Sequence, residues 1–234
     1  MTSPLVECQG LVKVLGRADD QTVAVNEVTF ELHAGDAVAL MGPSGGGKST
    51  LLGILGLMLR PTQGVLKVGG VVAPESDVAR ARLRNSYFGY VHQEHGVITS
   101  QSALGNACIP LEYARPKVSA AERRTRGEKV LARVGLAEKA HRRAGDLSGG
   151  ERQRVAISRS LINTPTVILA DEPTASLDTI TGMAIIDLLM DAKAHGVGVI
   201  IATHDYEVAR RCDRVVSIRD GRLERNSHPA AAGH

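Results

Sequence analysis

The chain has 234 residues, 43% of them hydrophobic, which is enough for one large α/β domain or for a core with a subdomain. Its 28 Lys and Arg against 25 Asp and Glu leave a net charge of +3, and only 3% of its residues are aromatic, so a nucleic-acid partner is not indicated. The longest apolar runs fall short of the roughly 18 residues of a membrane span, and we expect no secretory signal in MTSPLVECQG. Three widely spaced cysteines predict reduced thiols in a cytosolic protein: Cys8, Cys108 and Cys212.

The first part of the chain is rich in β-type residues. Residues 5–14 and 23–32 predict two strands of an antiparallel layer over the core. Residues 38–41 predict a short buried strand, and the run 48–59 predicts a helix with apolar residues on most sides.

The turn between that strand and that helix, GPSGGGKST, matches the pattern G-x-x-x-x-G-K-[ST]. Glycines let successive backbone N–H groups converge, and the new helix adds about half a positive charge at its N-terminus, so the turn predicts a phosphate cradle. Lys48 would reach the β and γ phosphates and the Ser49 hydroxyl would ligate Mg²⁺. An accidental glycine-rich match is the alternative, which the strand before it and the helix after it disfavour. The predicted nucleotide-binding residues here are Gly42, Pro43, Ser44, Gly45, Gly46, Gly47, Lys48, Ser49 and Thr50.

The middle of the chain changes from strands to helices. Gly69 and Gly70 between two apolar runs predict a hairpin, 77–85 a helix and 87–91 a core strand. The pattern from 101 to 161 is helical and charge-rich, which predicts an inserted helical subdomain.

The segment LSGGERQRVAISRSL begins with a helix start signal. Ser148 and Glu151 form an S-x-x-E capping box, and Gly149 and Gly150 leave the helix N-terminus bare, so that a phosphate can approach closely. Since the chain already has a phosphate cradle, a second one is useful if it serves a nucleotide held by another subunit.

Strands return in the last third, at 166–170, 197–202 and 214–218, with a helix at 179–194. Alternation of strand and helix predicts an α/β fold with a mostly parallel sheet covered on both faces.

Acidic and imidazole side chains follow two of these strands, at the edge where α/β proteins bind ligands. Asp171 is placed to hold Mg²⁺ and Glu172 to polarise an attacking water, unless the pair merely begins a loop before Pro173. His204 is placed to contact the γ-phosphate, although a histidine after a strand is by itself more often a loop residue.

These motifs, in this order, resemble the ABC ATPase family over nearly the whole chain. By that resemblance GPSGGGKST is Walker A, Gln93 the Q-loop residue, LSGGE the signature, VILADE Walker B, SLD the D-loop and THD the switch histidine. The resemblance implies a P-loop NTPase fold and a head-to-tail homodimer or heterodimer, with each ATP between the Walker A of one subunit and the signature of the other. For this chain we expect a homodimer. Gln93 would sense Mg²⁺ and the γ-phosphate, Ser148 and Gly150 would contact the opposite ATP, and Asp178 would couple the two sites.

More narrowly, the chain is similar to the group that serves macrolide export, lipoprotein release, haem export and the cell-division permease partner. That similarity implies an ATP-hydrolysing subunit of a transporter, cytoplasmic and peripheral on the inner face of the membrane through a separate permease. We expect one ATPase domain over about 1–225, with the core and β subdomain at about 1–93 and 162–225 and the helical subdomain at about 94–161. The patternless residues 226–234 predict a flexible tail. A non-transport ABC ATPase and an ATP-clamp switch module remain as alternatives.

Two departures from the family pattern stand out. Leu15 occupies the position of an aromatic residue that usually stacks on adenine, so base discrimination is expected to be weak or to come from another residue. The segment after Gln93, which normally meets the permease, lacks the usual aromatic residues. His92, Glu94 and His95 would suit a metal or haem contact, but a solvated loop is the preferred interpretation because no further ligand spacing supports a site.

Overall fold

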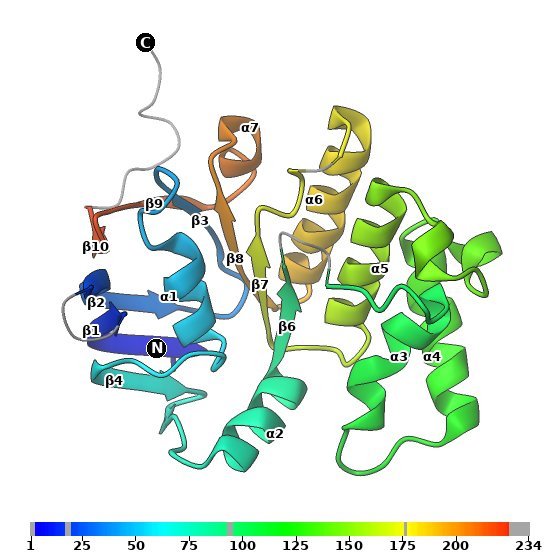
Figure 1. The fold of residues 1–234 in the computed structure, drawn as a ribbon, viewed down its shortest axis with the longest axis horizontal. Coiled ribbons are helices and arrows are strands. Elements are labelled where there is room, and N and C mark those ends of the chain that lie inside the picture. The colour runs from blue at the N-terminus through cyan, green and yellow to red at the C-terminus, as the bar shows by residue number, and fades with distance from the viewer. Residues whose placement is uncertain (1–2, 17–19, 93–95, 176, 225–234) are drawn as a thin grey trace.

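The computed structural model describes residues 3–16, 20–92, 96–175 and 177–224, and within them two sheets (Figure 1). The first is a four-stranded antiparallel sheet in the order β2-β1-β4-β5. Its strands are β1 (Val6–Leu15), β2 (Thr22–Leu32), β4 (Gln63–Val68) and β5 (Val71–Val72). The predicted antiparallel layer is therefore confirmed. So is the hairpin: β4 pairs with β5 through Val68 and Val71, which leaves Gly69 and Gly70, both at positive φ, as a two-residue turn.

The second sheet has six strands in the order β10-β9-β3-β8-β7-β6, and all neighbours are parallel except β10 and β9. Its strands are β3 (Ala37–Met41), β6 (Phe88–Val91), β7 (Val167–Asp171), β8 (Gly198–Thr203), β9 (Arg214–Arg219) and β10 (Arg222–Leu223). Because β3, β8 and β7 run in parallel, the residues that follow them all emerge at one edge of the sheet. This confirms the predicted α/β fold class.

Alternating residues of the central strands pack into two different cores. Val38 and Leu40 of β3 face a cluster that includes α1 (Lys48–Leu55) and the antiparallel sheet, whereas Ala37 and Ala39 face a cluster built with the helices that follow residue 102. The period of two along a strand produces this division. The first helix is thus buried between the two sheets, which fixes the phosphate loop that precedes it.

Helix α1 ends earlier than the predicted 48–59, and that prediction was wrong over its last residues. Gly56 caps the helix, Leu57 adopts a φ of +63°, and the chain turns back with the N–H groups of Met58 and Leu59 donating to the carbonyl of Gly53. A Cβ at Gly56 would lie 2.7 Å from a methyl group of Leu169, so glycine allows this turn to pack closely on β7. An apolar run does not distinguish a buried turn from a continued helix.

The remaining helices are α2 (Asp77–Tyr87), α3 (Ala103–Glu112), α4 (Ala120–Arg133), α5 (Gly149–Leu161), α6 (Thr179–Ala194) and α7 (Tyr206–Ala209), with short 3₁₀ turns at Ala137–Lys139 and Ala144–Asp146. Helices α3, α4 and α5 pack together at the right of Figure 1, and α5 also packs against β6. Each of these three begins behind a serine whose hydroxyl accepts a backbone N–H of the first turn. Helix α6 has the predicted bounds. None of the described helices is both long and apolar enough to cross a bilayer.

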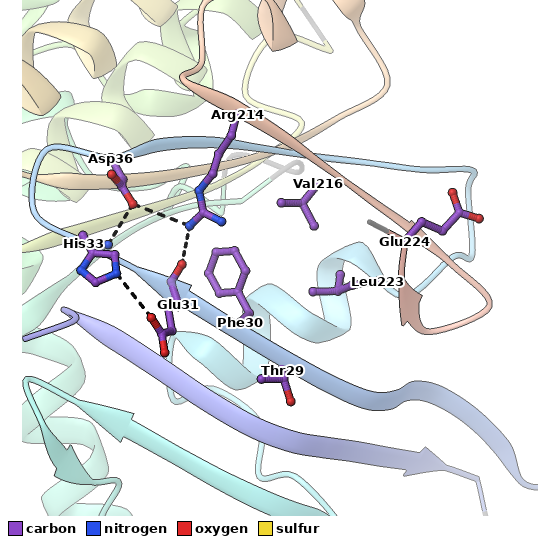
Figure 2. A pocket seen from close by; sticks show the side chains of 9 residues that line it. All are labelled: Thr29, Phe30, Glu31, His33, Asp36, Arg214, Val216, Leu223 and Glu224. Atoms are coloured by element: carbon purple, nitrogen blue, oxygen red, sulfur yellow. Dashed lines mark hydrogen bonds and ion pairs between the residues drawn. The ribbon is translucent and has the colours of Figure 1, made fainter. Parts of the chain in front are cut away.

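The two sheets are joined at one side by Arg214 of β9. Its guanidinium lies over the ring of Phe30, 5.0 Å from the centroid, donates to the carbonyl of Glu31 and lies 3.6 Å from the Asp36 carboxylate (Figure 2). These contacts tie β2 to the parallel sheet beside a hollow of about 540 Å³.

Candidate nucleotide-binding and catalytic site

The phosphate loop after β3 depends on close backbone approaches. Gly47 adopts a φ of +101°, and a Cβ there would lie 2.3 Å from the carbonyl oxygen of Ala24. A Cβ at Gly42 would lie 2.1 Å from the carbonyl oxygen of Ile218. Glycine is therefore required at both ends of the loop, which leaves its backbone N–H groups available to an anion.

Lys48 begins α1, and its side chain curls back over the loop. The ammonium donates to the carbonyl oxygens of Gly42 and Pro43 at 2.7 and 3.0 Å. Since an ammonium has three donors, these bonds orient the charge and leave donor capacity for a phosphate oxygen. The side chain is almost fully buried, so its charge is poorly screened by solvent.

Asp171 ends β7 and is buried at the floor of the site, with 7% of its surface exposed. Burial raises the pKa of this carboxyl, an effect that a hydrogen bond from Ser49 opposes. Within the described part of the chain, its Oδ1 atom has no hydrogen-bond partner. A buried carboxylate oxygen without a partner, beside a serine hydroxyl, fits a hard cation such as Mg²⁺, which takes few protein ligands and the oxygens of a phosphate.

Glu172 follows directly and has a strained backbone, with a φ of +46°. Its N–H donates to the carbonyl of Ala202 on β8 at 2.9 Å, which holds the left-handed conformation in place. Its Oε1 lies 2.9 Å from Nδ1 of His204, so the two side chains form a hydrogen-bonded pair. The Glu172 side chain is 11% exposed and that of His204 75% exposed, so the pair joins a largely buried carboxylate to an exposed imidazole.

The phosphate loop, Asp171, Glu172 and His204 line one cleft of about 940 Å³. Leu15 and Val23 also line it and are 40% and 46% exposed, so they offer apolar contact without an aromatic ring. Sequence reasoning missed several of the lining residues, namely Thr22, Val23, Ala24, Asp220 and Gly221. For the last two a signal was present, because Asp-Gly after an apolar strand is typical of a hairpin turn.

The signature segment lies apart from this cleft. Ser148 caps α5 with the predicted capping box: its hydroxyl accepts from the N–H of Glu151 at 3.3 Å, and Glu151 Oε2 accepts from the N–H of Ser148 at 2.9 Å. A hydrogen bond from Lys139 lowers the pKa of the Glu151 carboxyl. Ser148 is exposed and a Cβ at Gly149 would meet open space, yet neither residue lines the cleft of its own chain.

Asp178 likewise does not line the cleft. It caps α6 by accepting the N–H of Thr181 at 3.0 Å, and this bond lowers the pKa of its carboxyl.

Gln93, Glu94 and His95 lie outside the described residues. The ring of His92 stacks on Tyr90 with centroids 4.3 Å apart, and burial lowers its pKa.

A glycine cradle, a lysine at the start of the following helix, and acidic residues at the end of a neighbouring parallel strand together define a P-loop NTPase. The chain belongs to the ABC transporter family, whose profile matches residues 25–175. It is an ABC ATPase domain, as the resemblance implied.

Relatives by sequence include macrolide export ATP-binding/permease proteins MacB. That of Burkholderia lata is 42% identical over 225 residues, which cover 95% of this chain and 32% of that protein. That of Bradyrhizobium diazoefficiens is 40% identical over 234 residues, which cover 99% of this chain and 35% of that protein. The chain thus spans about a third of the length of these relatives.

Similar solved structures are ATP-binding cassettes. A dimeric post-hydrolysis state of the cassette MJ0796 bound to ADP and Pi has a TM-score of 0.91 and 35% identity, over 96% of this chain and 98% of that one. The cbiO1 protein of Clostridium perfringens, part of the ABC transporter complex cbiONQ, has a TM-score of 0.83 and 28% identity, over 97% of this chain and 89% of that one. These likenesses extend the family assignment to the whole fold.

Proposed function

We propose that the chain binds ATP with Mg²⁺, dimerises head to tail around two nucleotides and hydrolyses ATP to drive a membrane permease. The observation that carries the proposal is the division of the site: Lys48, Glu172 and His204 share a cleft, whereas the exposed helix tip at Ser148 does not line it. A second copy that offers its Ser148 to this cleft would complete the site. The dimeric state of the MJ0796 cassette supports this arrangement.

The residues present fit ATP and Mg²⁺. The glycine loop and Lys48 would hold the phosphates, and Ser49 and Asp171 would hold the cation, together with Gln93 by family resemblance. When bound, Mg²⁺ neutralises charge on the phosphate oxygens. The partly exposed Leu15 would rest against the base and give it dispersion contact only.

Glu172 is the proposed general base, because its carboxylate is shielded and sits at the cleft beside His204. It would take the proton of the attacking water while Lys48 stabilises charge on the phosphates. His204, bonded to Glu172 through Nδ1, would hold the carboxylate in line and would contact the terminal phosphate. Ser148, Gly149 and Gly150 would contact the ATP of the partner copy through the N-terminus of α5.

The link to transport rests on the relatives, which are named ATP-binding/permease proteins and are about three times as long as the matched segment. We infer that this chain performs the ATP-binding part and is peripheral on the cytoplasmic face of the inner membrane through a permease.

The test is steady-state phosphate release by the purified chain with Mg²⁺ and with EDTA, alongside its mass by size exclusion. The proposal predicts Mg²⁺-dependent hydrolysis and co-purification with a membrane protein from detergent extracts. Tight ATP binding without phosphate release would instead identify a clamp, and co-purification with ribosomes or DNA alone would identify a non-transport ABC ATPase.

A further inference from the structure

Gln153 lies on α5, about one and a half turns after Ser148, and its side chain is only 1% exposed. Its Nε2 donates a hydrogen bond of 2.9 Å to the carbonyl oxygen of Pro173. Pro173 directly follows Glu172. A buried amide of the signature helix is therefore tied to the backbone beside the proposed general base.

The backbone of Glu172 needs such support. A φ of +46° persists in a residue other than glycine only where the surroundings hold it. On one side the N–H of Glu172 donates to Ala202, and within the turn its carbonyl accepts from the N–H of Ala175 at 3.2 Å. The bond from Gln153 holds the next peptide along the chain, so it resists rotation of the segment that carries the carboxylate.

The same helix also contacts the far end of this segment. A Cβ at Gly150 would lie 3.1 Å from Cδ2 of Leu177, the residue before Asp178. Helix α5 therefore contacts both Pro173 and Leu177, and a displacement of its first turns would reach the backbone next to Glu172.

We propose that Gln153 is a positioning residue that makes the alignment of Glu172 depend on the position of the signature helix. The inference rests on the proposed function. Because Ser148 at the tip of α5 contacts the nucleotide of the partner copy, Gln153 links the occupancy of that site to the general base of its own chain.

The test uses Gln153→Met, which keeps the side-chain length and removes the amide donor. A misplaced catalytic group can cost up to about 10²-fold in rate, so we expect kcat to fall about tenfold. The KM for ATP should stay within about twofold, because the phosphate loop is untouched. The matched control is Ser158→Ala, which removes a buried hydroxyl of the same helix that donates within that helix, to the carbonyl of Arg154 at 2.9 Å. It should leave kcat unchanged.

The deciding comparison places Gln153→Met in a Glu172→Gln background and measures single-turnover hydrolysis. If Gln153 acts through Glu172, the second change adds less than about a twofold loss, since the group it positions has already been removed. A loss that multiplies with that of Glu172→Gln would overturn the proposal, as would an unchanged kcat in the single variant. Gln153→Asn, whose amide is one methylene too short to reach Pro173, serves the same comparison if the Met variant is too unstable to purify. If the wild-type protein itself releases no phosphate, the proposed function fails; if it does and Gln153→Met is fully active, only the role of Gln153 is wrong.

Discussion

Replacing Glu172 by Gln tests the assignment of the general base. In the wild-type chain Oε1 of Glu172 lies 2.9 Å from Nδ1 of His204. The change keeps the shape of the side chain and an oxygen able to accept from this Nδ1, but it removes the group that takes a proton. A general base contributes about 10²–10⁴ in rate, or roughly 2.7–5.4 kcal/mol of barrier at 1.36 kcal/mol per decade. We therefore expect phosphate release to slow by at least about 10². ATP binding should remain intact, because the residues that hold the phosphates are unchanged.

The assay is phosphate release with ATP and Mg²⁺, combined with size exclusion in the same buffer. Slow hydrolysis should trap an ATP-bound dimer, which elutes at twice the mass of the free chain. The control is Glu207→Gln, which removes the same charge from an exposed residue on α7 that pairs with Arg210 at 3.2 Å. Hydrolysis by Glu172→Gln near the wild-type rate would refute the reasoning and remove Glu172 from this role.

Other predictions concern the base, the loop and the thiols. Because Leu15 offers adenine no ring to stack on, GTP should compete with ATP within about tenfold, and a strong native preference for ATP would contradict this. Leu15→Tyr should tighten ATP binding roughly 2–10-fold in a competition assay, since stacking adds about 0.5–1.5 kcal/mol. Gly47→Ala places a Cβ 2.3 Å from the carbonyl oxygen of Ala24, at a residue whose φ is +101°. The resulting strain of about 1–3 kcal/mol should lower Tm and abolish ATP binding. An unchanged melting curve would contradict this prediction. Burial raises the pKa of the Cys8 and Cys212 thiols from 9.0 to about 12, so at pH 8 iodoacetamide should modify them about 10³-fold more slowly than in the unfolded chain. Because folding favours the neutral thiols, their contribution to stability is present below pH 9 and is lost as the pH rises from about 9 to 12, which denaturant titrations at several pH values would detect.

The local patterns were sufficient for most elements of the fold. Helix α6 has its predicted bounds because Asp178 is a strong N-cap and the apolar spacing continues to Ala194. Apolar strands that alternate with helices predict the parallel sheet, and a parallel sheet brings Asp171, Glu172 and His204 to one edge, where they line the same cleft.

What the sequence did not predict depends on contacts between distant segments. The end of α1 at Leu55 is set by close packing of Gly56 on Leu169, which no local pattern records. The left-handed backbone of Glu172 and its bond to His204 arise from the pairing of β7 with β8. The bond from Gln153 to Pro173 likewise joins residues that are far apart in sequence, and its only local sign is a glutamine on the buried face of a capped helix.

The central claim is that each hydrolytic site is shared between two copies of the chain. Lys48→Ala removes the ammonium that lies on the phosphate loop and that we propose holds the β and γ phosphates, and Ser148→Arg blocks the tip of α5. Each variant alone should be nearly inactive, because a symmetric dimer of either has two damaged sites. A mixed dimer has one site with both lesions and one that pairs an intact phosphate loop with an intact signature.

The most direct measurement is therefore phosphate release by the two variants mixed at a series of ratios, with heterodimer formation followed by differently tagged chains. Shared sites predict partial recovery that is greatest near equal amounts, where mixed dimers are most abundant. Absence of recovery at every ratio, in samples where the tagged heterodimer does form, would contradict the shared site.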